Sequence, residues 1–85
     1  ISVKIFVHLE PPRSASNVKK IRMLYQEEYP LKKPDVDNVA KIILDALNGI
    51  AYRDDKQVVE LYVKKSYAGE SGVGVTISEV EAKNE

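Results

Sequence analysis

The middle of the chain carries a helical repeat of apolar residues, and this repeat limits the possible folds more than any other feature. Starting near Asp37, apolar residues recur along one wide helical face, and Gly49 supplies a left-handed stop after it. The members of this face are Val39, Ile42, Ile43, Ala46 and Leu47. A face of this width needs a second element to cover it. The segment 2–9 is a candidate, because its apolar residues alternate as in a half-buried strand: Val3, Ile5, Val7 and Leu9.

A shorter helix is predicted on the amino-terminal side of this one. Ser14 or Ser16 can cap it, and the pattern runs to about Glu28, where Pro30 stops it. The apolar positions at helical spacing are Val18, Ile21, Leu24 and Tyr25. These residues are the predicted buried face of the helix.

The last third of the chain favours two strands. Residues 57–67 are rich in β-branched and aromatic residues, and residues 73–77 alternate. Residues 69–72 begin and end with glycine, and we expect them to form a hairpin connection between the two strands. Residues 81–85 are expected to fray. The order β-α-α-β-β predicts a small α+β domain over residues 1–85, with a mixed sheet packed against helices.

The composition excludes several classes of protein. Eighty-five residues leave room for one core only. The chain has no cysteine, which excludes disulfides and zinc–thiolate sites and favours the reducing cytoplasm as its location. No apolar run approaches the ~20 residues of a membrane-spanning helix. Because the chain begins at Ile1 inside a strand-like pattern, we expect further sequence to precede it.

The net charge is zero, but the charges are unevenly distributed. Residues 13–33 hold six basic and two acidic side chains, a balance of +4, whereas residues 34–60 hold three basic and six acidic ones, a balance of −3. A basic segment beside an acidic one suits a protein that attracts phosphates and holds metal next to them, with Lys32 and Lys33 as candidate phosphate contacts. Two solvated faces explain the same pattern.

Asp35 and Asp37 are the strongest candidates for metal ligands. If the backbone is extended there, both side chains lie on one side, roughly 7 Å apart at the backbone, and can share a hard cation such as Mg²⁺. The local alternative is that Asp37 caps the helix and Asp35 interacts favourably with its positive end. The Asp-x-Asp pair alone does not decide between them.

Four further charged residues follow this pair. Lys41 lies one helical turn beyond Asp37, where it can stabilise a phosphate or take part in an ion-pair ladder. Asp45 is two turns away, about 12 Å by helix rise, and is interpreted as structural. Asp54 and Asp55 precede a strand, so only one is expected to face the site, and strand alternation does not choose between them.

Two other kinds of site are not supported by the sequence. An EF-hand loop needs Asp or Asn at its fifth position and Gly at its sixth, where this chain has Val39 and Ala40. A catalytic triad is not supported, because His8 is the only histidine and lies in a predicted strand. The tyrosines at positions 52, 62 and 67 can stack on bases, but their pattern favours amphipathic packing residues.

The segment from Lys33 to Val58 resembles the RusA family of Holliday junction resolvases. The matching residues are Lys33-Pro34-Asp35-Val36-Asp37-Asn38, then Lys41, then the run from Asp45 to Val58. The match continues more loosely through Lys65 and the last strand. Several spaced identities make a far more specific signal than one Asp-x-Asp pair.

The resemblance implies a phage- or prophage-type endonuclease that acts as a homodimer, needs Mg²⁺ or Mn²⁺, and nicks four-way DNA junctions symmetrically. By position it makes Asp35, Asp37 and Asp55 the metal-binding catalytic aspartates and Lys41 the catalytic lysine. Lys65 falls where the family keeps a basic residue, and it joins Lys32 and Lys33 as an expected DNA contact.

A different class of function remains open at this stage. The chain can be a non-catalytic DNA-binding or assembly module that keeps the fold and uses its aspartates only as caps. The family usually begins with a basic, proline-containing segment around its first strand, and that segment is not visible here.

Overall fold

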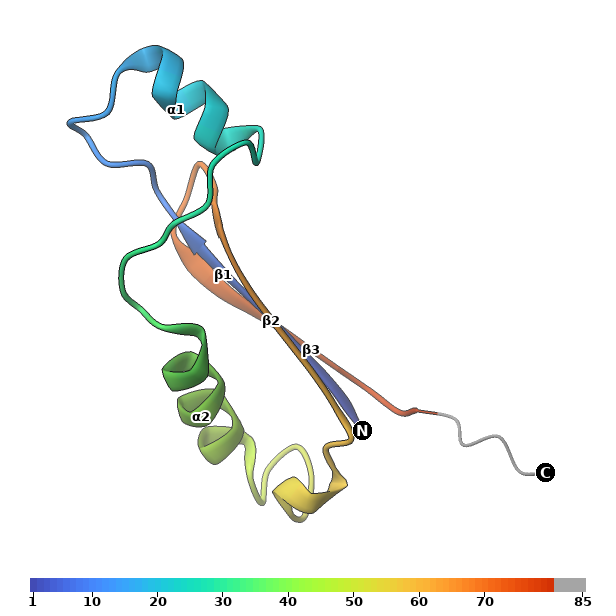
Figure 1. The fold of residues 1–85 in the computed structure, drawn as a ribbon. Helices are drawn as coiled ribbons and strands as arrows, with labels where there is room; N and C mark the ends of the chain where they lie inside the picture. The colour runs from blue at the N-terminus through green and yellow to red at the C-terminus, as the bar shows by residue number, and fades with distance from the viewer. Residues whose placement is uncertain (81–85) are drawn as a thin grey trace.

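The computed structural model describes residues 1–80 except for the side chain of Asp55, and residues 81–85, expected to fray, lie outside this range. It confirms the predicted element order and the α+β class. Strand β1 (Ser2–Leu9) is central, with β2 (Glu60–Tyr67) on one side and β3 (Gly72–Ser78) on the other (Figure 1). The sheet is mixed, because β1 runs parallel to β2 and antiparallel to β3. Within the described range, no helix is long and apolar enough to cross a membrane.

The predicted hairpin between the last two strands is wrong. β2 and β3 each pair with β1 and not with each other, so the connection between them carries the chain past the end of β1. β1 takes the centre because Val3, Ile5 and Val7 are buried, whereas every residue of β3 is exposed. Local alternation identifies a strand, but the distribution of apolar residues over the whole chain decides its neighbours.

Helix α2 (Val36–Leu47) covers one face of this sheet and forms the core with it. The apolar residues around the buried face of β1 are Val39, Ile43, Leu44 and Leu47 of the helix and Val63 of β2. Tyr52 completes the core at 6% exposure, and its hydroxyl donates to the Leu44 carbonyl at 2.9 Å. Ile42 is 67% exposed, so the buried face is narrower than the repeat predicted. The helix stops as expected, with Gly49 at a φ of 78°.

Helix α1 (Asn17–Leu24) ends four residues before the predicted position. Ser16 caps its start by accepting the Lys19 N–H at 3.2 Å. At its end Gln26 takes a φ of 64°, and the N–H groups of Gln26 and Glu27 bond back to Met23 and Arg22 at 3.1 and 2.9 Å. This is a Schellman motif, which satisfies the last carbonyls and reverses the chain.

The predicted buried face of α1 is also wrong. Val18, Ile21, Leu24 and Tyr25 are all exposed, and Met23 is the buried residue of the helix. Figure 1 shows the reason, since α1 lies beyond the ends of β1 and β2 instead of over the sheet. Only the side of the helix that carries Met23 therefore meets the rest of the molecule.

The phenol of Tyr52 provides a test of this packing. Tyr52→Phe should lower the free energy of unfolding by about 1 kcal/mol, because it removes a part-buried hydrogen bond and leaves the ring in place. Tyr25→Phe is the matched control, since Tyr25 is 77% exposed, and it should leave stability unchanged. Urea unfolding of the full-length protein measures both. Equal shifts of the two midpoints would contradict the assigned role of Tyr52.

Candidate functional site

The two aspartates of the Asp-x-Asp motif lie at the first turn of α2. Asp35 is the N-cap residue, with φ −75° and ψ 140°, but its side chain makes no capping hydrogen bond. Asp37 lies inside the first turn, and its Oδ1 accepts the Asn38 N–H at 3.0 Å. The extended backbone therefore ends at Asp35. The alternative prediction that Asp37 caps the helix is wrong, because Asp35 occupies the N-cap position. Both side chains are exposed, so their carboxylates face solvent.

Lys41 and Asp45 continue along the same helix, and both are exposed. Within residues 1–80, Lys41 makes no ion pair with Asp37 or Asp45, so the predicted ladder is absent from the described part of the chain. The Lys41 ammonium is left in solvent one turn beyond the aspartates. Its position is compatible with contact to a bound phosphate.

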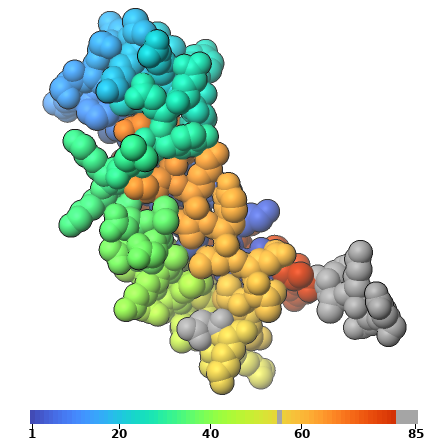
Figure 2. Space-filling view, in the orientation of Figure 1, coloured from blue at the N-terminus to red at the C-terminus, as the bar shows by residue number. Residues whose placement is uncertain are grey.

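The connector between the helices, residues 26–35, is fastened to the sheet by one side chain. Lys65 of β2 is half-buried, and its Nζ donates to the carbonyl of Lys32 at 2.7 Å. Figure 2 shows the connector running between α1 and α2 with its side chains projecting from the surface. Lys32 and Lys33 are exposed there. Lys65 thus holds the backbone that leads into Asp35, a role that the sequence did not indicate.

The acidic pair lies at the other end of α2. The 3-10 helix η1 (Asp55–Gln57) follows the carboxyl end of α2 and precedes β2 (yellow in Figure 1). Since α2 has 12 residues and is ~18 Å long, its length separates the backbone of Asp55 from Asp35. The Asp54 carboxylate accepts the Lys56 N–H at 2.9 Å and so caps this turn. The side chain of Asp55 lies outside the described part of the structure.

The chemistry of the α2 start fits a hard divalent cation. Mg²⁺ is commonly held by one or two carboxylates together with waters and substrate phosphates. Asp35 and Asp37 supply two carboxylates on neighbouring backbone positions, and only one of their four oxygens accepts a hydrogen bond from a described residue. Among the described side chains, no group of three acidic or histidine residues is placed to hold one cation. The start of α2 therefore supplies two of the carboxylates that such a site needs.

The structure also brings together two residues that nothing in the sequence connects. Lys19 of α1 and Tyr67 of β2 lie far apart in sequence, but they line one cavity together with Lys32 and Lys33. Neither residue belongs to a motif. The sequence signals were the excess of basic residues between positions 13 and 33, which includes Lys19, and the ability of Tyr67 to stack on bases.

Comparison with known proteins identifies the family. The family model of endodeoxyribonuclease RusA matches residues 1–78. The uncharacterized protein YqaN of Bacillus subtilis (strain 168) is 44% identical over 84 residues, which are 96% of this chain and 59% of that protein. The chain thus spans a little over half the length of this relative. No solved structure matches the chain. Since the family model covers nearly all of the sequence, the resemblance seen from Lys33 to Val58 is confirmed, and the chain belongs to the RusA endodeoxyribonuclease family.

Proposed function

We propose that this chain is the catalytic part of a metal-dependent endonuclease that resolves four-way DNA junctions. The observation that carries the proposal is the start of α2, where the Asp35 and Asp37 carboxylates face solvent directly after a basic connector. Metal-assisted hydrolysis of a phosphodiester needs negative groups that bind a cation. It also needs positive groups nearby that bind the phosphates. Membership of the RusA family supports the reaction class.

Asp35 and Asp37 are proposed to hold Mg²⁺, with Mn²⁺ as a substitute. When bound, the cation lowers the pKa of water and stabilises charge on the phosphoryl oxygens. Asp35 contributes a carboxylate with no capping bond, and Asp37 contributes at least its Oδ2 atom. No side chain of this chain needs to act as a nucleophile, which agrees with the absence of cysteine.

Lys41 is proposed to stabilise the negative charge that develops on the phosphate during hydrolysis. It lies one turn from Asp37 on the same helix, and its ammonium makes no ion pair with the described residues. A fixed positive charge beside a reacting phosphate lowers the barrier more than it strengthens ground-state binding. Lys32, Lys33 and Lys65 are proposed to contact the DNA backbone.

Asp55 is proposed as the third carboxylate, on the basis of the family resemblance. Its backbone lies near the far end of α2, so this role requires residues 53–57, between the core residues Tyr52 and Val58, to approach the start of α2 when DNA binds. Asp54 is not proposed as a ligand, because its carboxylate caps the turn before β2.

A homodimer is proposed because a four-way junction is cut in two symmetry-related strands, and two copies of one site supply paired cuts. The exposed apolar residues on β3 support such an association. Val73, Val75 and Ile77 share a face with the core residues of β1, yet remain 53%, 39% and 37% exposed. A second copy could cover this row.

The alternative function is a DNA-binding module without catalysis. The separation of the Asp55 backbone from Asp35 by the length of α2 favours it. The two functions differ in one observable, the appearance of nicked product from a junction.

The proposed reaction is tested with a labelled synthetic four-way junction and the full-length protein. We expect symmetric nicks with Mg²⁺ and none with EDTA. Asp37→Asn should remove cleavage while junction binding survives, because it removes a negative ligand. Asp45→Asn is the matched control on the same helix and should cut at the wild-type rate. Wild-type cleavage by Asp37→Asn would exclude this site, and binding without cleavage by the wild type would select the alternative.

The acidic pair gives a second test of the site. Asp55→Asn should abolish cleavage, whereas Asp54→Asn should leave substantial activity, because an Asn side chain can still accept the Lys56 N–H. The junction assay measures both variants, and melting temperatures verify that both fold. Equal losses would show that Asp54 also contributes to the reaction, and retention of activity by Asp55→Asn would leave Asp35 and Asp37 as the site.

The role of Lys41 is separable from simple DNA binding. Lys41→Ala should lower the cleavage rate about 100- to 1,000-fold, the effect of losing one transition-state donor, with much less change in affinity. If Lys41 were one phosphate contact among many, its loss would instead weaken binding and reduce the salt slope by about one. Single-turnover cleavage and salt-dependent binding distinguish the two. Lys4→Ala, an exposed lysine on the opposite face of the sheet, is the control.

A further inference from the structure

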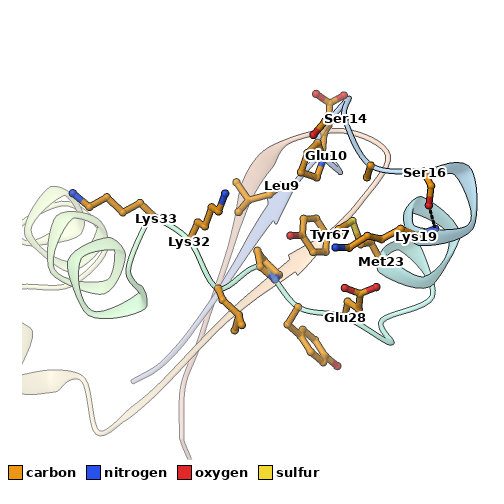
Figure 3. A pocket seen from close by; sticks show the side chains of 15 residues that line it. Leu9, Glu10, Ser14, Ser16, Lys19, Met23, Glu28, Lys32, Lys33 and Tyr67 are labelled. Atoms are coloured by element: carbon orange, nitrogen blue, oxygen red, sulfur yellow. Dashed lines mark hydrogen bonds between the residues drawn. The ribbon is translucent and has the colours of Figure 1, made fainter.

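A cavity of about 620 Å³ lies between α1, the end of β1 and the connector (Figure 3). Its volume falls in the range of sites that enclose a small organic group. Three parts of the chain form its walls, namely residues 9–23, residues 28–33 and Tyr67 of β2. Gln26, between the first two parts, bonds the chain to the third, since its Nε2 donates to the Tyr67 carbonyl at 3.1 Å. The cavity is therefore held by tertiary contacts and not by one loop.

The charges around the cavity favour an anion. Lys19, Lys32 and Lys33 line it, against two carboxylates from Glu10 and Glu28. None of the three ammonium groups has a hydrogen bond or ion pair with a described residue. Figure 3 shows Lys19 on the α1 side and Lys32 on the connector side, so an anion that enters meets positive charge from both walls. A phosphate group is the anion that such a pair of lysines suits.

The inner surface of the cavity is apolar and carries one aromatic ring. Met23 and Pro30 are buried and Leu9 is half-buried. Tyr67 is half-buried beside Met23, and its hydroxyl has no partner among the described residues (Figure 3). A flat ring next to a thioether provides a surface for the face of a nucleobase, whose stacking on aromatic side chains is independent of base identity.

The position of the cavity relates it to the candidate active site. Lys33 lines the cavity and precedes Asp35 by two residues, so their Cα atoms lie no more than ~7 Å apart. The hydrogen bond from Lys65 to the Lys32 carbonyl holds this wall against the sheet. A DNA strand whose phosphate lies at Asp35 is therefore within reach of the Lys33 edge of the cavity.

We propose that the cavity takes one unpaired nucleotide of the DNA strand that is cut, with its phosphate between Lys19 and Lys32 and its base against Tyr67 and Met23. The inference rests on the proposed nuclease function, because that function brings DNA to Asp35. A paired base offers only its edges in the grooves, whereas a base against Tyr67 presents its face. The nucleotide must therefore leave the stack.

This requirement links the cavity to selectivity for branched DNA. Extracting a base from an intact duplex costs a few kcal/mol, and the cost is smallest where the base is already unpaired. Base pairs at the crossing point of a junction lack the continuous stacking of an uninterrupted duplex, so a base is extracted there at lower cost. The cavity then favours cleavage close to the branch, without reading the sequence.

The test combines an abasic scan with variants of the cavity in the full-length protein. Junctions that carry a single abasic site keep the phosphate and lack the base, and their affinities are measured in EDTA. One position beside the cut site should weaken binding about 5- to 150-fold, the contribution of one stacked base. Tyr67→Leu, which retains apolar bulk, should weaken binding of the intact junction similarly, and the abasic site should then have no further effect.

Lys19→Ala tests the phosphate contact without disturbing the core, because Lys19 is exposed. It should reduce the salt slope of binding by about one, whereas Lys20→Ala, a neighbour on α1 that does not line this cavity, should not. A flat abasic scan overturns the proposal. An abasic effect that persists in full in Tyr67→Leu also overturns it, because the base would then lie elsewhere.

The outcome is separable from that of the proposed function. Cleavage of the unmodified junction by the wild type, together with a flat abasic scan, retains the nuclease and rejects the nucleotide site. An abasic effect that depends on Tyr67, in a protein that does not cleave, retains the nucleotide site and rejects the nuclease.

Discussion

The burial of one face of β1 under α2 is the interaction on which the rest of the structure depends. Val3, Ile5 and Val7 are nearly inaccessible, and they are the centre of the only cluster of buried residues found in the described part of the chain. Burying side chains of this size contributes roughly 1.5–3 kcal/mol each. The helix that covers them is also the element that begins with Asp35 and Asp37. The same contact that stabilises the fold therefore orients the candidate site.

The connector joins this rigid centre to the peripheral helix α1. Lys65 bonds the connector to β2, and Gln26 bonds its beginning to Tyr67. Two side-chain contacts to main-chain carbonyls are thus what positions the basic residues relative to Asp35. Lysine suits this arrangement, because its flexible stem crosses apolar surface while the ammonium donates hydrogen bonds at its end. The basic residues of the connector and the acidic residues at the start of α2 therefore belong to one continuous stretch of chain.

The candidate site divides into parts that differ in how the fold supports them. Asp35, Asp37 and Lys41 share one helix, so helix geometry fixes their spacing. Asp55 belongs to the turn before β2, whose conformation is held locally by Gln57, since its Oε1 accepts the N–H groups of Arg53 and Asp54 at 2.8 and 3.3 Å. Tyr52 and Val58, which flank this turn, pack in the core, so only the residues between them can shift without disturbing it. The proposed approach of Asp55 to Asp35 is therefore confined to residues 53–57.

The sequence by itself determined the element order, the α+β class, the stop at Gly49 and the position of the Asp-x-Asp pair at a helix start. These features follow from local rules, namely apolar periodicity, capping and the backbone preference of glycine, which act within a few residues. The sequence did not determine that β1 lies between β2 and β3, that α1 buries Met23, or that Lys19 and Tyr67 share a cavity. Those outcomes were decided by tertiary structure, because they depend on which distant surfaces compete for the same small core.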